Sequence, residues 1–260
     1  MNSRPSKILI VKTGSTYPEL KKSCGDFEHW IAAILAEKGF RSQTIPVARL
    51  EPDRLVRFQG IIFTGSHSSL TQPYAYLKGL ERVIDVILNN KIPTLGICFG
   101  HQLIHYLMGG EVIRNPLGLE IGITRLSLTI EGMSDPLFSG MNPVRTDVYS
   151  SHADVVTRTA PGSVILARSD QTDVQATRIV GHIGTIQFHP EYDRDRMAFI
   201  IRKNWDWILN QHYYNPLYVT DPHVILSRNR QIRNRKQVLF NFCTQVSAFD
   251  ERRSPSTQMA

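Results

Sequence analysis

Length, composition and cysteine usage are those of an ordinary globular protein. The chain has 260 residues, of which 42% are hydrophobic and 20% are charged, as in typical folded domains. The cysteines Cys24, Cys98 and Cys243 form no CxxC pair, which argues against a disulfide framework or a zinc site and indicates a reducing, cytoplasmic environment. The apolar run near the N-terminus is shorter than a signal peptide requires, and no stretch approaches the roughly 20 apolar residues that cross a bilayer. We therefore expect no membrane association.

The net charge of +7 is concentrated toward the C-terminus. Residues 221–260 hold seven basic and three acidic side chains, a surplus of +4. No aromatic-interleaved basic repeat and no zinc-finger spacing accompanies this surplus, so we do not expect nucleic-acid binding. A solvated basic helix or a docking face for an acidic partner is the interpretation that we prefer.

In chain order, short apolar runs first alternate with longer segments of helical periodicity. This alternation predicts a parallel sheet covered by helices. The predicted strands of this part are 7–11, 42–46, 60–63 and 94–97, and the predicted helices are 27–38, 76–89 and 100–108.

After residue 110 the pattern changes to strands joined by turns, which indicates a partly antiparallel lobe. The strands expected here are 121–130, 144–149, 164–169, 174–179 and 184–188. They are followed by a helix over 193–211, a loop over 212–223, a last helix over 236–246 and a frayed end over 251–260. The chain is thus expected to form one domain over 1–211 and a basic C-terminal extension over 212–260.

One segment carries the signature of a nucleophile. Cys98 lies between Gly96 and Gly100 where a predicted strand meets a predicted helix. A G-x-C-x-G turn of this kind needs small neighbours so that the nucleophile stands clear of the sheet. The helix N-terminus that follows favours the thiolate and directs free N–H groups toward a developing oxyanion. A buried, inert core thiol is the alternative interpretation of Cys98.

A second segment supplies a base and a residue that orients it. His189 ends a predicted strand, and Glu191 follows two residues later across Pro190. His189 is expected to pair with the thiol and to protonate the leaving group, with Glu191 holding the other ring nitrogen. An ordinary loop is the alternative for this tripeptide alone. Because open α/β sheets place their sites at the carboxyl ends of strands, the two segments together predict a Cys98–His189–Glu191 triad.

These segments, GICFGHQ at 96–102 and FHPE at 188–191, resemble the two signatures of the class I, triad-type glutamine amidotransferases. The most similar kind is the stand-alone set that resembles the amidotransferase domain of GMP synthase. The resemblance spans roughly residues 7–210. It implies an α/β fold with a flavodoxin-like, mostly parallel sheet flanked by helices, a small antiparallel strand-rich lobe and a C-terminal helical extension.

The resemblance also implies a chemistry and a set of site residues. Cys98 would attack the glutamine carboxamide to form a γ-glutamyl thioester, and the ammonia released would serve a synthetase on a separate chain, since this chain has no P-loop or ATP-grasp segment. No metal or other cofactor is expected. The oxyanion hole would be formed by Gly65, Ser66 and Phe99, and the amino-acid end of the substrate would be held by Gln102, Ser151, His152 and Ala153.

Two positions depart from the family pattern. Ser66 stands where the family has a glycine of its Gly-Gly-Pro loop, and Ala153 replaces the glycine of its Ser-His-Gly-Asp segment. These departures leave open a γ-glutamyl peptidase or hydrolase with the same triad, and a non-catalytic regulatory module is a further alternative. The i, i+4 pair of His101 and His105 has no third ligand at a metal-binding distance in sequence, so we interpret it as packing. Trp205 and Trp207 are interpreted as packing residues of the C-terminal region.

Overall fold

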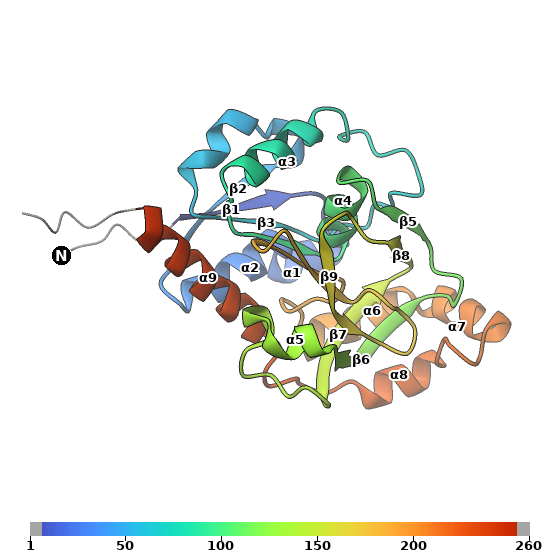
Figure 1. Cartoon of the computed structure of the whole chain (residues 1–260). Coiled ribbons are helices and arrows are strands. Elements are labelled where there is room, and N and C mark those ends of the chain that lie inside the picture. Colours follow the sequence, from blue (N-terminus) through green and yellow to red (C-terminus); the bar gives the residue numbers. More distant parts are fainter. Residues whose placement is uncertain (1–6, 254–260) are drawn as a thin grey trace, which may run out of the picture.

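A nine-stranded mixed sheet forms the centre of the molecule in the computed structural model, which describes residues 7–253 (Figure 1). In spatial order its strands are β2 (Arg41–Pro46), β1 (Lys7–Lys12), β3 (Gly60–Phe63), β4 (Thr94–Ile97), β11 (Ile183–Ile186), β10 (Ala176–Ile179), β9 (Ser163–Arg168), β6 (Glu120–Leu128) and β7 (Thr146–His152). The first five strands are parallel and the others pair antiparallel. The order β2-β1-β3-β4-β11 is the flavodoxin-like arrangement, in which sites form at the carboxyl ends of the strands.

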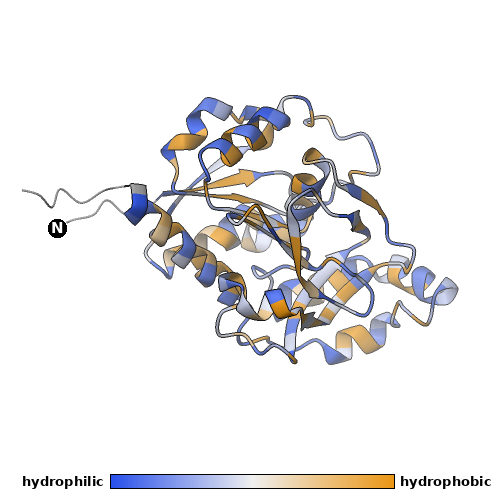
Figure 2. Ribbon diagram, in the orientation of Figure 1, coloured by the Kyte–Doolittle hydropathy of each residue, from blue (hydrophilic) through white to orange (hydrophobic). Residues whose placement is uncertain are grey.

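Helices cover both faces of the parallel half of the sheet. Helices α2 (Phe27–Ala36) and α9 (Gln237–Arg253) lie on one face, and α3 (Leu80–Asn89) and α4 (Phe99–Leu107) on the other (Figure 1). The side chains of β1 alternate accordingly, with Ile8 and Ile10 packed toward α2 and α9, and Leu9 and Val11 packed toward α3 and α4. A strand buried on both faces is apolar throughout, as the orange central strands of Figure 2 show.

The remaining elements form the strand-rich lobe and its cover. Strands β5 (Glu111–Arg114) and β8 (Asp154–Arg158) make a separate antiparallel pair. The helices are α1 (Pro18–Cys24), α5 (Ile130–Ser134), α6 (Arg194–Lys203), α7 (Trp205–Tyr214) and α8 (Pro222–Arg228), with 3₁₀ helices η1 (Val47–Arg49), η2 (Pro52–Arg57) and η3 (Pro136–Phe138). The predicted fold class is confirmed, including the small antiparallel lobe.

Several element boundaries differ from the sequence prediction. The helix expected from residue 76 begins at Leu80, because Gly79 has a left-handed conformation with φ of 89°. The single helix expected over 193–211 is two helices that meet at Asn204, and part of the expected loop at 212–223 belongs to α7 and α8. Strand β5 and helix α1 were not predicted.

Helix α9 is longer than predicted and completes the core of the sheet. Val238, Leu239, Phe242 and Val246 are buried together with residues of β1, β3 and α2. A Cβ atom at Gly60 of β3 would lie 2.5 Å from a methyl carbon of Val246, so the helix rests directly on this strand. The first three residues of the predicted frayed end belong to α9, and 254–260 lie outside the described residues. The division of the chain at residue 211 stays a prediction.

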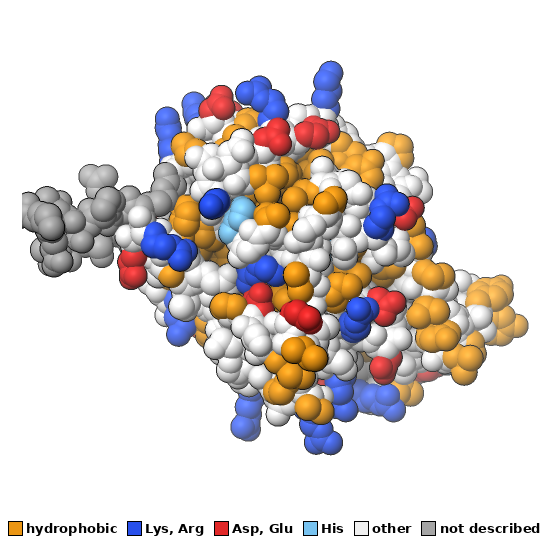
Figure 3. Space-filling view, viewed as in Figure 1, with side chains coloured by type: hydrophobic (Ala, Val, Ile, Leu, Met, Phe, Trp, Pro, Cys, Tyr) orange, Lys and Arg blue, Asp and Glu red, His pale blue; other side chains and the backbone are white. Residues whose placement is uncertain are grey.

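The surface carries dispersed charge and one exposed apolar area. On the face seen in Figure 3, Lys and Arg side chains are scattered, whereas hydrophobic side chains gather over α7 at the right-hand end. Tyr213, Tyr214 and Leu217 contribute to this apolar area with exposed fractions of 78%, 75% and 89%. None of the helices within residues 7–253 combines the length and hydropathy that a membrane span needs.

Candidate active site

Cys98 occupies a strained turn between β4 and α4. Its φ of 51° and ψ of −102° make it one of three non-glycine residues with positive φ in the described chain, a conformation that a side chain with a Cβ adopts only when its surroundings enforce it. A Cβ at Gly96 would lie 2.7 Å from the carbonyl oxygen of Gly100, and one at Gly100 would lie 2.5 Å from that of Phe63. Both glycines are therefore required for the turn to pack against β3.

His189 and Glu191 lie on the loop that follows β11, the parallel neighbour of β4. Nδ1 of His189 lies 2.7 Å from Oε1 of Glu191, and both side chains are buried. The loop is fixed from outside, since Arg196 donates a hydrogen bond to the carbonyl of Glu191 and Arg235 donates one to that of Pro190. A buried carboxylate held this way orients the imidazole and stabilises its protonated form.

The imidazole of His189 is placed by aromatic packing and by two anionic neighbours. The ring of Tyr192 stacks on it at a centroid distance of 4.1 Å and an angle of 3°, and Phe27 stacks at 5.9 Å. Burial alone lowers the pKa of His189, but the charges of Glu191 and Cys98 outweigh it and raise that pKa to about 10. The geometry therefore favours an imidazolium beside a thiolate at neutral pH.

Gly65 lies between the thiol and the imidazole. The Cβ that Gly65 lacks would lie 2.9 Å from Cε1 of His189 and 3.7 Å from Cβ of Cys98. A side chain here would separate the two groups. The backbone N–H groups of Ser66 and Phe99 form no hydrogen bond within residues 7–253, so both are free to donate to an oxyanion. The structure thus places the three residues predicted for the oxyanion hole around Cys98.

The residues predicted to hold the substrate lie along the same cleft. Gln102 of α4 donates hydrogen bonds to the carbonyl oxygen of Asp154, at 2.9 Å, and to Oε1 of Gln187, at 3.1 Å. Ser151 and His152 end β7, and Nε2 of His152 lies 2.9 Å from the buried carboxylate of Glu120. The cleft is lined by Cys98, Ser66, Gln102, Ser151, His152 and Ala153 among others. The roles of these residues stay predictions.

The structure explains both departures from the family pattern. The side chain of Ser66 is directed toward the loop after β1, where a Cβ at Gly14 would lie 2.0 Å from its Oγ. Gly14 therefore makes room for the serine. Ala153 is not among the residues with positive φ, so its methyl group causes no strain in the backbone.

Further residues of the cleft were missed by the sequence prediction. The hydroxyl of Tyr17 donates a hydrogen bond to Asn204, and the ring of Tyr17 contacts that of His67 edge-on at 4.3 Å. Arg114 lies over the ring of Trp207 at 5.3 Å. All five residues line the cleft. The packing role predicted for Trp207 is thus incomplete, whereas Trp205 does pack, against His223 of α8. These residues come from loops and helix ends, where no periodicity or motif marks them.

The histidine pair on α4 is part of the interior. Nδ1 of His101 lies 2.7 Å from the hydroxyl of Thr185, and Nε2 of His105 lies 3.0 Å from that of Thr177. Burial lowers the pKa of both histidines, that of His105 to about 4. Across residues 7–253, the His, Cys, Asp and Glu side chains form no group of three or more suited to a metal ion.

Comparison with known proteins places the chain in a family. The model of the glutamine amidotransferase class-I family matches residues 21–205. The chain belongs to the class-I glutamine amidotransferases. The matched region contains both signature segments and most of the cleft, whereas Trp207 and helices α8 and α9 lie beyond it.

Similar proteins include whole and divided GMP synthases. The chain is 32% identical over 182 residues to one subunit of the divided, glutamine-hydrolysing GMP synthase of Saccharolobus solfataricus, with the match covering 70% of this chain and 92% of that protein. It is 31% identical over 183 residues to the GMP synthase of Aeropyrum pernix, covering 70% of this chain but only 34% of that longer protein.

Other similar proteins differ in their named function or are similar in fold alone. Gamma-glutamyl peptidase 4 of Arabidopsis thaliana is 29% identical over 185 residues, covering 70% of this chain and 74% of that protein. Among solved structures, a glutamine amidotransferase of Thermotoga maritima has a TM-score of 0.69 at 21% identity, covering 96% of this chain and all of that one. This structural likeness shows the shared fold.

Proposed function

We propose that this protein hydrolyses the side-chain amide of glutamine through a thioester on Cys98 and supplies the ammonia to a synthetase on a separate chain. The observation that carries the proposal is the meeting of Cys98, His189 and Glu191 at the carboxyl ends of β4 and β11 in a member of the class-I amidotransferase family. The free N–H groups of Ser66 and Phe99 beside the thiol support it further.

The proposed reaction begins with attack of the Cys98 thiolate on the carboxamide carbon. The electron pair of the C=O bond moves onto oxygen, which accepts hydrogen bonds from Ser66 and Phe99. When the C–N bond breaks, the imidazolium of His189 donates a proton to the leaving nitrogen, which departs as ammonia. Neutral His189 then takes a proton from water, the hydroxide cleaves the thioester, and glutamate leaves with the thiolate restored.

A separate acceptor of the ammonia is supported by the relatives. The protein from Saccharolobus solfataricus is named as one subunit of a GMP synthase and has nearly the length of the matched region. In the longer Aeropyrum pernix protein the matched region is about a third of the chain. We propose that this protein likewise acts with an ATP-dependent synthetase as its partner, and adding such a partner should raise its rate of glutamine hydrolysis.

The test uses the nucleophile and a matched cysteine. Wild-type protein should release ammonia from glutamine, C98A should not, and C24A should retain the wild-type rate because Cys24 is exposed and far from the triad in sequence and fold. An alkylating glutamine analogue should label Cys98 alone by mass spectrometry. Glutamine turnover by C98A, or labelling that prefers Cys24, would refute the proposal.

A γ-glutamyl peptidase is the second candidate. The relative from Arabidopsis thaliana and the substitutions at Ser66 and Ala153 favour this alternative. Its triad chemistry is the same, and an amino acid or peptide leaves in place of ammonia. Parallel assays with glutamine and a γ-glutamyl dipeptide distinguish the two: the peptidase should have the higher kcat/KM for the dipeptide without any partner, and the amidotransferase for glutamine.

A further inference from the structure

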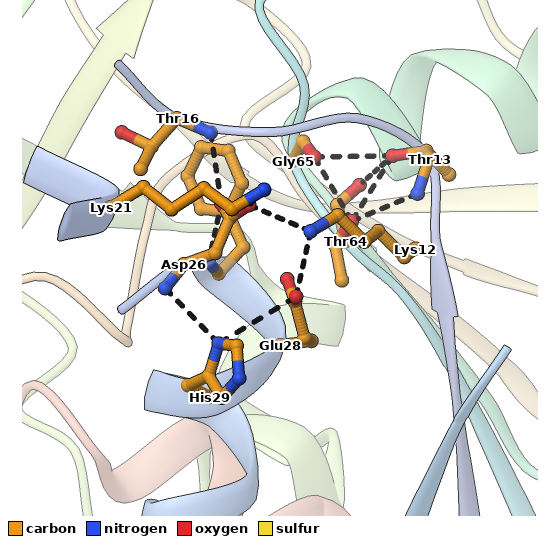
Figure 4. Close-up of polar contacts among 10 residues, drawn as sticks. Lys12, Thr13, Thr16, Lys21, Asp26, Glu28, His29, Thr64 and Gly65 are labelled. Carbon is orange, nitrogen blue, oxygen red and sulfur yellow. Dashed lines mark hydrogen bonds and ion pairs between the residues drawn. The ribbon is translucent and has the colours of Figure 1, made fainter. Parts of the chain in front are cut away.

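Two threonine hydroxyls hold the carbonyl group of Gly65. Oγ1 of Thr64 lies 3.0 Å and Oγ1 of Thr13 lies 3.1 Å from this carbonyl oxygen, and each can donate to it (Figure 4). The backbone N–H of Thr13 donates to Oγ1 of Thr64 at 3.1 Å, which leaves the Thr64 hydroxyl proton for the carbonyl. Both threonine side chains are buried. The orientation of the Gly65 carbonyl is therefore fixed from the side of β1.

A fixed carbonyl also fixes the N–H group of the next residue. The peptide bond is planar and trans, so the N–H of Ser66 points opposite to the carbonyl of Gly65. That N–H has no hydrogen-bond partner within residues 7–253, and Ser66 lines the cleft with Cys98. We propose that Thr64, supported by Thr13, is a positioning residue that keeps the Ser66 N–H directed at the oxyanion formed on Cys98. This inference rests on the proposed function.

The threonine pair is itself anchored by a buried ionic cluster. Asp26, with no exposed surface, accepts hydrogen bonds from Nζ of Lys12 at 2.7 Å and from the backbone of Thr16 at 2.8 Å (Figure 4). Lys12 is also 2.7 Å from Glu28. These contacts hold both ends of the loop that carries Thr13 and Gly14. The loop therefore cannot move away from Gly65 without breaking buried ion pairs, which is costly.

The same strand end is tied to the nucleophile. The carbonyl of Thr64 accepts hydrogen bonds from Oγ1 of Thr13 at 2.9 Å and from the backbone N–H of Gly100 in α4 at 3.1 Å. The two proposed oxyanion donors, Ser66 and Phe99, are thus positioned relative to each other through one residue. Preorganised donors of this kind stabilise a transition state because they need no rearrangement during the reaction.

The test replaces the hydroxyl without changing the shape of the side chain. In T64V the peptide after Gly65 loses one of its two hydrogen-bond donors, so kcat for glutamine should fall between tenfold and hundredfold, short of or equal to the loss of a whole oxyanion donor. KM should change little, because the amino-acid end of the substrate is held elsewhere. T64S restores the hydroxyl and should recover kcat to within about threefold.

Two controls separate positioning from a general structural effect. T94V removes an equally buried hydroxyl of the neighbouring strand β4, which donates to Ile92 at 2.9 Å at the opposite end of the sheet, and should keep the wild-type kcat. Alkylation of Cys98 by iodoacetamide, which forms no oxyanion, should proceed at the same rate in T64V as in wild type.

The possible outcomes decide between the two proposals. If T64V keeps its kcat, if T64S is as slow as T64V, or if Cys98 alkylation slows in parallel with kcat, the positioning role is wrong while the proposed function stands. If the wild-type protein turns over neither glutamine nor a γ-glutamyl dipeptide, the proposed function fails and this inference fails with it.

Discussion

The contact between Gly14 and Ser66 allows a sharp test of how this chain tolerates a serine in its oxyanion loop. A Cβ at position 14 would lie 2.0 Å from Oγ and 2.6 Å from Cβ of Ser66, whereas ordinary contacts begin near 3.4 Å. Because φ of Gly14 is not positive, alanine at this position meets no backbone strain. The G14A substitution therefore tests the steric conflict alone.

The expected cost of G14A follows from the size of the overlap. Forcing one extra methyl group into a packed site costs about 1–3 kcal/mol, and the displaced Ser66 should also lower kcat about tenfold, since its N–H would leave the oxyanion. S66G removes the obstacle at the cost of the hydrogen bond from the Ser68 N–H to Oγ of Ser66, about 1 kcal/mol. In the S66G background, G14A should change stability by less than about 0.5 kcal/mol and should leave kcat unchanged.

A double-mutant cycle measures this coupling. Urea unfolding gives the free energy of unfolding for the four proteins, and ammonia release from glutamine gives kcat. A coupling free energy of about 1–3 kcal/mol between positions 14 and 66 is expected. If G14A costs the same with serine and with glycine at position 66, the steric account of the serine is refuted.

Two further predictions concern the base and the last helix. Because the carboxylate of Glu191 raises the pKa of His189 while burial lowers it, E191Q should lower that pKa and shift the alkaline loss of glutamine hydrolysis, near pH 10 in the wild type, by at least about one unit toward neutral pH; an unshifted alkaline limb in a pH–rate profile would contradict the assignment. In α9, F242A should cost about 3–5 kcal/mol in urea unfolding, because Phe242 is buried in the main core, and F240A should cost clearly less, because Phe240 is only partly buried; equal costs would argue against α9 as a core helix.

The features predicted correctly from the sequence are those set by local patterns. Cys98 between two glycines at a strand end specifies a turn whatever the rest of the chain does, and the structure contains that turn. The loop of His189 and Glu191 could be placed beside it because both segments follow apolar strands, and such strands end at one edge of a parallel sheet. The signature segments also identified the family.

The features that were missed depend on contacts between distant segments. Nothing near Ser66 in sequence shows that Gly14 provides its space, because that contact joins loops after two different strands. Trp207 reaches the cleft only because the helix predicted over 193–211 breaks at Asn204 and α7 takes a new direction. The partly exposed strand β5 lacks the apolar run by which strands were recognised.

The packing of α9 on the sheet bears on how the protein is made in the cell. Val246 contacts β3 at Gly60, so the ribosome must add nearly two hundred further residues after the strand before its covering helix exists, which takes about 10–40 s at typical elongation rates. Until then one face of the nascent sheet has no apolar cover, and it is exposed to premature association. Binding of a chaperone to the growing chain over this interval, and its release once α9 has emerged, would be the expected course of biosynthesis.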